Sequence, residues 1–259
     1  MKLHSKGQYF EFEPEVKFLY THVILQDDTH YYSVEVPERH VREEDIPDIS
    51  SHPSLRRIPP EHIWPKMEPN LTICPNPESP GVYIKRPDLP SYRHTPCLGL
   101  WLLHEARMCE LLINKSHKNI AQYLGCVVEN DRITGLCFQK YEETLAHRLC
   151  DGRYVNNEDC LRQVAAGLDY LHSLDIVHND IRADNVMFKT QHDDVPIVVD
   201  FDSSAIRGSP LPDKRRVPPG IRTAEFENDA YGLEMLRREI VEEQRDQEFL
   251  RKNYTADVL

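Results

Sequence analysis

Three polar residues at fixed spacing lie in one short segment, residues 176–188, whose sequence is IVHNDIRADNVMF. His178, Asp180 and Asn185 follow the pattern H-x-D-x-x-x-x-N, and a further acid, Asp200, comes directly after an apolar run. Phosphoryl transfer requires such groups: a carboxylate that receives the proton of the attacking hydroxyl, and an amide and a carboxylate that hold Mg²⁺ on the phosphates. The types and the order of these residues therefore indicate phosphoryl-transfer chemistry.

The apolar pattern predicts the elements that position this segment. Before it, Asn156 or Asn157 can cap a helix. The apolar face of this helix consists of Leu161, Val164, Ala165, Leu168 and Leu171. The end of the segment, residues 186–188, is predicted as a short strand, and residues 197–199 as a second one, with a polar loop between them. A last helix is predicted to begin at about Asn228.

Earlier in the chain, Val82–Lys85 is predicted as a short strand and Leu98–Asn114 as a helix. Two apolar runs, Ile120–Val128 and Ile133–Tyr141, are joined by the polar residues 129–132, which is typical of a β-hairpin. Strands, one helix and a hairpin therefore precede a part of the chain that is mostly helical.

In these motifs and their order the chain resembles a protein kinase-like domain, closest to the divergent kinase-like domains of fungi. The resemblance implies an α+β, two-lobed fold with a nucleotide cleft between the lobes. Residues 46–140 would form a small β-rich N-lobe, and residues 141–259 a mainly helical, shortened C-lobe that ends near the helix anchoring the catalytic loop. The resemblance does not explain residues 1–45, where strand-like stretches predict a β-rich extension of unassigned role.

The resemblance assigns a role to each polar residue of the loop. Asp180 would orient the acceptor hydroxyl and accept its proton, while Asn185 and Asp200 would hold Mg²⁺. Arg182 falls where a basic residue would contact the transferred phosphate, and His178 is expected to pack and to form hydrogen bonds.

A second match is the strand Val82-Tyr83-Ile84-Lys85, whose lysine would bind the α- and β-phosphates of ATP. Glu105, on the helix that follows, would hold Lys85 in place through an ion pair. Glu110, further along the same helix, is the alternative partner.

The strand end Cys137–Tyr141 resembles the segment that enters the hinge between the lobes. Gln139 would then guard the back of the nucleotide pocket, and the backbone from Lys140 through Tyr141 to Glu142 would hydrogen-bond adenine. An ordinary strand end is the alternative interpretation. Asp229 resembles the buried aspartate that anchors the catalytic loop, which is a structural role.

Three departures from the family pattern concern the loop and the nucleotide. Asn179 replaces the arginine that usually meets a phosphate on the activation loop, which indicates either activity independent of loop phosphorylation or a change without functional meaning. No G-x-G-x-x-G precedes Lys85, so the lid over the phosphates is missing or built otherwise. Tyr83 stands where alanine usually faces adenine, and a phenol there can fill the pocket.

Two further departures concern the metal and the C-lobe. Asp202 replaces the glycine after Asp200-Phe201 and adds a carboxylate near the metal, as in small-molecule phosphotransferases related to aminoglycoside and choline kinases. The chain ends soon after Asp229, so we expect the last helix to be partly uncovered, with residues 1–45, a partner or self-association covering it.

These features predict an ATP- and Mg²⁺-dependent protein kinase that acts on serine or threonine of a protein substrate. One alternative is a pseudokinase, a binding scaffold that keeps the fold without turnover. Another is a small-molecule phosphotransferase, suggested by Asp202 and the shortened C-lobe, although the stretch from His104 to Val128 favours the protein-kinase lineage.

Net charge, apolar runs and cysteine content indicate which partners and which cellular compartment to expect. The net charge of -12 over 259 residues argues against a surface for nucleic acid or anionic membrane. No apolar run reaches a membrane-spanning length, and the N-terminus lacks the apolar core of a signal peptide. Seven scattered cysteines without a C-x-x-C motif predict reduced thiols in a cytoplasmic or nuclear protein.

Overall fold

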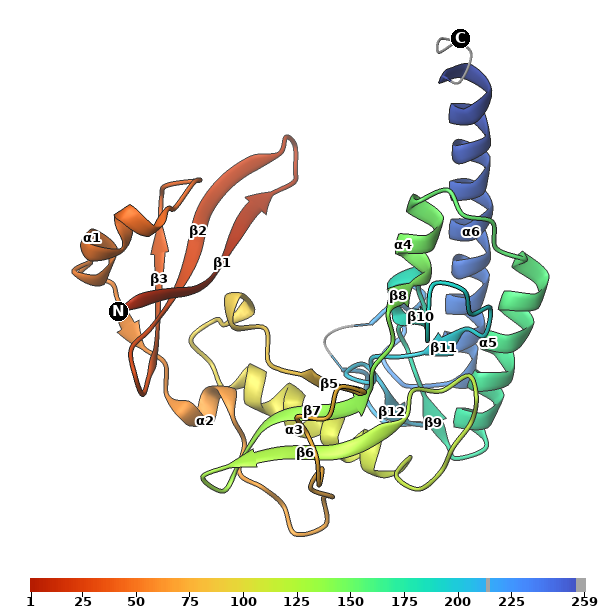
Figure 1. The fold of residues 1–259 in the computed structure, drawn as a ribbon, viewed down its shortest axis with the longest axis horizontal. Helices are drawn as coiled ribbons and strands as arrows, with labels where there is room; N and C mark the ends of the chain where they lie inside the picture. Colours follow the sequence, from red (N-terminus) through yellow and green to blue (C-terminus); the bar gives the residue numbers. More distant parts are fainter. Residues whose placement is uncertain (213–214, 255–259) are drawn as a thin grey trace. The chain divides into compact units, whose positions relative to one another are not determined.

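The fold is shown in Figure 1 as a computed structural model that describes residues 1–212 and 215–254. The chain divides into two compact units. Unit 1 comprises Met1–Pro69, Arg86–Leu103 and Val127–Gly135, and unit 2 comprises Asn70–Lys85, His104–Cys126 and Leu136–Leu259. The division into an extension at 1–45 and lobes at 46–140 and 141–259 stays a prediction, and residues 255–259 of the predicted C-lobe lie outside the described part.

Unit 1 is built on a four-stranded antiparallel sheet in the order β1-β2-β3-β4. Its strands are β1 (Lys2–Glu11), β2 (Lys17–Gln26), β3 (Tyr31–Val36) and β4 (Arg56–Arg57). Along β2, Val23 and Leu25 belong to one core cluster and Ile24 to another, and all three are fully buried. Because both faces of this sheet are covered, β2 carries a continuous apolar run instead of an alternating pattern.

Different helices cover the two faces of this sheet. One face packs against α1 (Ile46–Ser50), which follows the 3₁₀ turn η1 (Glu43–Asp45). The other face packs against α2 (Pro60–Ile63), the 3₁₀ turn η2 (Leu89–Ser91) and the start of α3 (Cys97–Glu110).

A second sheet, in the order β5-β7-β6, contains the strand that carries Lys85. Its strands are β5 (Val82–Lys85), β7 (Arg132–Gln139) and β6 (Tyr123–Glu129). The outer edge of β6 is covered, because Cys126 exchanges backbone hydrogen bonds with Thr72 (2.7 Å) and Cys74 (2.9 Å). Among the described residues, no strand pairs with the outer edge of β5.

The remainder of unit 2 is mainly helical. Its helices are α4 (Leu145–Cys150), α5 (Asn157–His172) and α6 (Phe226–Tyr254), and α5 and α6 pack side by side (Figure 1). Two small sheets, ordered β11-β10-β8 and β12-β9, connect them. Their strands are β8 (Glu143–Thr144), β9 (Ile176–Val177), β10 (Val186–Phe188), β11 (Ile197–Val198) and β12 (Ala205–Ile206), with the 3₁₀ turn η3 (Ala183–Asn185) before β10.

Local sequence explains where α5 begins. The side chain of Asn156 accepts a hydrogen bond from the backbone N–H of Asp159 at 3.1 Å, so Asn156 is the cap. Glu158 and Asp159 in the first turn are favourable beside the positive end of the helix dipole. Four residues of the predicted apolar face are buried, Leu161, Val164, Leu168 and Leu171, and Ala165 is partly buried.

The exposed face of α6 is largely charged. Glu234 forms ion pairs with Arg237 and Arg238 one turn along the helix, at 3.5 and 3.2 Å. Val241 and Phe249 are the large apolar side chains exposed on the described part of α6. The inward residues Leu236 and Ile240 are fully buried, and water can solvate the charged outer face of the helix. That residues 1–45, a partner or self-association covers the helix stays a prediction. No described helix is both long and apolar enough to span a membrane.

A close approach joins α6 to the catalytic loop. A Cβ atom at Gly232 would lie 2.9 Å from the Cβ atom of Ile181, the residue after Asp180. Glycine is therefore required there so that the helix axis can come close to the loop.

We expect Gly232→Ala to lower the free energy of unfolding by about 1 kcal/mol, because an overpacking cost of about 1–3 kcal/mol exceeds the roughly 1 kcal/mol gained from alanine in a helix. Urea unfolding followed by circular dichroism measures this change. Arg238→Ala on the exposed face is the control and should change stability by less than about 0.5 kcal/mol. A Gly232→Ala protein as stable as the wild type would contradict the close approach.

Candidate functional site

One buried carboxylate fastens the predicted catalytic loop, residues 178–185, to α6. Asp229 is 1% exposed, and it accepts hydrogen bonds from the backbone N–H groups of His178 (2.9 Å) and Asn179 (2.7 Å). A ring nitrogen of His172, at the end of α5, lies 2.8 Å from the same carboxylate. A buried carboxylate is tolerated where such donors surround it, so the loop, α5 and α6 hold one another in place.

His178 packs beneath the loop. Its Nε2 donates to the carbonyl oxygen of Val199 at 3.1 Å, and its ring meets that of Phe201 edge to face at 5.6 Å between centroids. The ring is fully buried. This placement agrees with the packing role expected from the sequence.

Asp180 and Asn185 lie together on the loop. The side-chain amide of Asn185 donates to Oδ2 of Asp180 and to its backbone carbonyl, both at 2.9 Å. These bonds use the Nδ2 group of Asn185, so its Oδ1 is the atom suited to a cation. Burial raises the pKa of the Asp180 carboxyl, although the charges of His178 and Arg182 oppose the shift.

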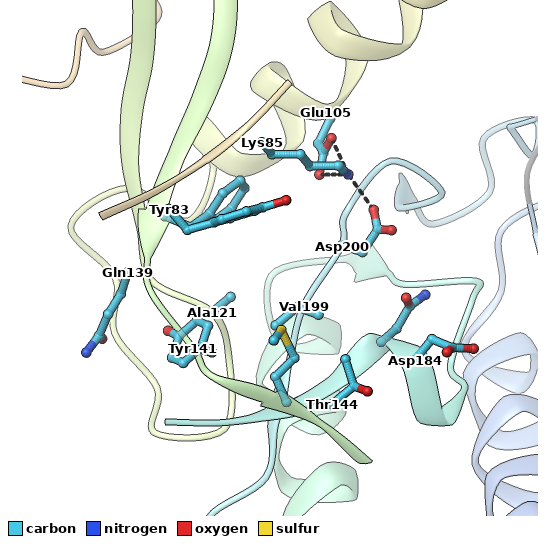
Figure 2. Close-up of a pocket in the computed structure, with 13 residues that line it drawn as sticks. Tyr83, Lys85, Glu105, Ala121, Gln139, Tyr141, Thr144, Asp184, Val199 and Asp200 are labelled. Carbon is cyan, nitrogen blue, oxygen red and sulfur yellow. Dashed lines mark hydrogen bonds and ion pairs between the residues drawn. The ribbon is translucent and has the colours of Figure 1, made fainter. Parts of the chain in front are cut away.

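The structure brings Lys85, Glu105 and Asp200 together. Figure 2 shows Nζ of Lys85 between the two carboxylates, 2.7 Å from both oxygens of Glu105 and 2.6 Å from Oδ1 of Asp200. Glu105 is 2% exposed and also accepts the backbone N–H of Phe201 at 3.2 Å. Glu105 therefore positions both the lysine and the segment that carries Asp200.

Electrostatics favours the charged forms of Lys85 and Asp200, whereas burial raises the pKa of the Glu105 carboxyl against the opposing charge of Lys85. Burial disfavours the Lys85 ammonium, but the carboxylates of Glu105, Asp200 and Asp202 outweigh it and raise the pKa of Lys85. Burial also opposes ionisation of Asp200, yet Lys85 holds the pKa of Asp200 below its ordinary value. Asp202, the acid in place of glycine, additionally accepts a hydrogen bond from the Ser203 hydroxyl at 2.9 Å.

Glu110, the alternative partner of Lys85, has a different role. Its Oε1 accepts the Thr72 hydroxyl at 2.6 Å, and its Oε2 accepts the Thr72 backbone N–H at 2.9 Å. This bidentate contact fixes the segment that covers the edge of β6.

A cavity of about 340 Å³ lies beside the cluster. It is lined by Tyr83, Lys85, Glu105, Ala121, Phe138, Gln139, Tyr141, Thr144, Asp184, Asn185, Met187, Val199 and Asp200. Tyr83 is 54% exposed and, in Figure 2, extends beneath Lys85 with its hydroxyl end toward Asp200. The phenol therefore borders the cavity without filling it, and the remaining space lies within the range typical of small-molecule sites.

Phe138 and Gln139 both line the cavity, from opposite faces of the strand β7. In the β5–β7 register Tyr83 pairs with Phe138, so these two side chains and Lys85 share one face of the sheet. Gln139 pairs with Val82 on the other face, and in Figure 2 its amide end points away from Lys85. The role of Gln139 as the residue that guards the back of the nucleotide pocket stays a prediction.

The expected adenine-binding backbone is only partly available. The Lys140 N–H donates to the carbonyl of Gly81 at 2.9 Å, and the Glu142 N–H donates to the carbonyl of Phe188 at 3.1 Å. Between them, the N–H of Tyr141 has no partner among the described residues. The Tyr141 hydroxyl accepts the backbone N–H of Gln122 at 3.0 Å, which holds this turn in place.

Two arginines beside the loop are paired with acids. Arg182 is half exposed, and its guanidinium lies 2.8 Å from Asp184, one of the cavity residues. Glu239 of α6 accepts the Ala183 N–H at 3.1 Å and pairs with Arg216 at 2.5 Å. Arg182 therefore lies near the cavity, where Asp184 neutralises it.

Sequence reasoning missed Phe138, Asp184, Thr144 and Met187 as cavity residues. Asp184 stands directly before Asn185 in the motif, and that adjacency is a signal that could have found it. The place of Phe138 depends on the pairing register between β5 and β7, which residue spacing does not reveal.

Comparison with protein families matches residues 101–217 to the protein kinase domain, a range that includes the catalytic loop and Asp200. Mitogen-activated protein kinase kinase kinase 5 of Homo sapiens is 37% identical over 110 residues, which are 39% of this chain and 8% of that protein. The probable casein kinase II subunit alpha homolog of Encephalitozoon cuniculi is 31% identical over 104 residues, which are 37% of this chain and 32% of that protein.

Among solved structures, the yeast RNA Pol II CTD kinase CTDK-1 complex is similar with a TM-score of 0.48 and 19% identity, over 62% of this chain and 55% of that chain. The chain thus spans less than a third of the curated relatives named above.

The α+β fold class is confirmed, and so is the resemblance on which the site was predicted. Lys85 lies outside the matched range, yet the structure joins it to Asp200 inside that range. Residues 101–217 are therefore similar to the protein kinase domain, and the geometry around Lys85 and Asp200 agrees with that similarity.

Proposed function

We propose that the protein is an ATP-dependent protein kinase that transfers phosphate to a serine or threonine hydroxyl. The observation that carries this proposal is the position of Lys85, whose Nζ lies within 2.7 Å of both Glu105 and Asp200. In this arrangement a cation that would bind phosphate lies directly beside a carboxylate that would bind the metal.

Each residue of the cluster has a separate task in this proposal. Asn185, through Oδ1, and Asp200 would hold Mg²⁺, which supplies charge neutralisation on the phosphates. Lys85, oriented by Glu105, would bind the phosphate oxygens. Asp180 would align the acceptor hydroxyl and take its proton, and its side chain already has a fixed orientation through Asn185.

Lys85 and Asp200 neutralise each other in the free protein. A phosphate bound to Lys85 would leave Asp200 without its counter-charge, whereas a metal bound to Asp200 would leave Lys85 paired with Glu105 alone. Binding of nucleotide and metal together satisfies both groups, so we infer that Mg²⁺ and ATP bind as one complex.

The purine would lie between the two walls of the cavity. The Tyr141 N–H is the backbone donor suited to the base, and the aromatic ring of Tyr83 would cover the base from the side where the family normally has alanine. Stacking on an aromatic ring is worth about 1–3 kcal/mol per base. Tyr83 would thereby replace part of the covering that a glycine-rich loop provides.

A pseudokinase is the second candidate, because no described strand pairs with the outer edge of β5, where a phosphate lid would belong. A small-molecule phosphotransferase is favoured by one observation only, the extra carboxylate of Asp202. Labelled ATP offered with peptide mixtures or with small alcohols distinguishes these candidates from a protein kinase.

We expect Asp180→Asn to lower phosphate transfer at least about a hundredfold, as for loss of a general base, while the Kd for Mg-ATP changes less than about threefold. Transfer of labelled phosphate and isothermal titration calorimetry measure the two effects. Asp169→Asn, on the exposed side of α5, is the matched control and should match the wild type in both. Transfer that survives Asp180→Asn would refute the assigned base, and a wild type that binds Mg-ATP without transfer would identify a pseudokinase.

Removal of the Tyr83 ring should weaken nucleotide binding. For Tyr83→Ala we expect a Kd for Mg-ATP roughly tenfold higher, because the stacking contact is lost. Tyr83→Phe keeps the ring and should bind within about twofold of the wild type. Tighter binding by Tyr83→Ala would mean that the ring obstructs the cavity.

The pH dependence of transfer should reflect Asp180. Because burial raises the pKa of this carboxyl, the base form is present above that pKa and is lost as the pH falls through it. We expect the acid limb of kcat above the ordinary aspartate pKa of about 3.9. Measuring the Kd for Mg-ATP over the same range separates binding from transfer, and an acid limb below 3.9, the ordinary value, would contradict the raised pKa.

A further inference from the structure

Asn179 occupies a fully enclosed position between three segments of unit 2. It is 1% exposed, and its backbone has a φ of 63°, a conformation that asparagine tolerates better than most residues. Its Nδ2 donates to the carbonyl oxygens of Val177 (3.2 Å) and Ser203 (3.1 Å). Its Oδ1 accepts a hydrogen bond from Nδ2 of Asn228 at 3.0 Å.

Asn228 continues this connection into α6. Its side-chain amide, 2% exposed, also donates to the carbonyl of Thr223 at 2.9 Å. Two neutral amides therefore join the catalytic loop to Ser203 and to Thr223, near the start and the end of the segment that follows Asp200. We call the pair Asn179 and Asn228 the amide latch.

The amide latch acts on the turn that carries Asp200. One end of this turn is held by Glu105, which accepts the N–H of Phe201 at 3.2 Å. The other end is held by Asn179, which donates to the carbonyl of Ser203. Asp200 lies in a left-handed conformation, with a φ of 67°, so both attachments are needed to keep an unfavourable backbone geometry in place.

No charge is involved in this connection. An ordinary arginine at position 179 would require a buried counter-charge, whereas each polar group of the Asn179 side chain has a neutral partner. The backbone N–H of Arg216 donates to the carbonyl of Asn179, and the guanidinium of Arg216 forms an ion pair with Glu239. The hydroxyl-bearing Ser203 and Ser204 are fully buried.

We propose that Asn179 and Asn228 are positioning residues that fix the Asp200 segment through neutral hydrogen bonds, so that its active geometry needs no phosphate on the segment. The catalytic meaning of this latch rests on the proposed kinase function, while its structural effect does not.

The test compares Asn179→Gly, Asn228→Ala and the double variant with the wild type, before and after treatment with a protein phosphatase. Glycine keeps the positive φ of Asn179 and removes only its amide. Asn156→Ala is the control, because it removes an asparagine side-chain hydrogen bond of similar length, 3.1 Å, at the exposed cap of α5. Hydrogen exchange of residues 200–206, without nucleotide, is the first readout, and unchanged protection of α3 verifies that each variant is folded.

We expect exchange in residues 200–206 to rise at least about tenfold in both single variants and no further in the double variant, because the two amides act as one unit. Phosphatase treatment and Asn156→Ala should leave this exchange unchanged. Unchanged exchange in Asn179→Gly, or loosening of wild-type residues 200–206 by phosphatase, would overturn the proposal.

A second readout distinguishes positioning from general support. Displacement of Asp200 should raise the Mg²⁺ concentration needed for nucleotide binding at least about fivefold in Asn179→Gly, and saturating Mg²⁺ should restore binding. An unchanged Mg²⁺ requirement would contradict the link to Asp200. If the wild type binds nucleotide without transferring phosphate, the proposed kinase activity is wrong. The exchange and Mg²⁺ results still test whether the amide latch positions Asp200.

Discussion

A single ammonium group shared by two carboxylates is the constraint on which the site depends. Lys85 comes from an edge strand, Glu105 from α3 and Asp200 from a turn far along the chain. Each charge would be costly when buried alone, so the three elements are stable only when they lie together. The backbone N–H of Phe201 donates to Glu105, which ties the turn that carries Asp200 to the same helix.

Much of the site could be predicted because its residues belong to short sequence motifs. The spacing from His178 to Asn185 and the strand around Lys85 were readable as motifs, and the cap at Asn156 marked the start of α5. The register in which strands pair could not be predicted from the sequence. Period-2 alternation shows that a strand has two faces, but the β5–β7 register decides that Phe138 shares a face with Lys85.

Neutral contacts between distant residues were harder still to foresee. Asn179 could be recognised as the replacement of an arginine, yet its contacts depend on Asn228, which lies 49 residues further along the chain in the first turn of α6. Hydrogen bonds between amides leave no charge pattern or hydrophobic period in a sequence. The occupation of the Lys140 N–H by Gly81 was equally hidden, because backbone partners do not depend on side-chain identity.

In the proposed function, the charge balance of the cavity would make the metal a condition for nucleotide binding. The cavity lining contains one ammonium group, Lys85, and the carboxylates of Glu105, Asp184 and Asp200. A triphosphate alone would add negative charge to a wall that is already negative. A divalent cation on Asn185 and Asp200 would reverse this balance at the point where the phosphates are proposed to lie. The acidic surroundings would then favour a metal–nucleotide complex over either component, and the neutral amides of Asn179 and Asn228 would position Asp200 without adding another charge.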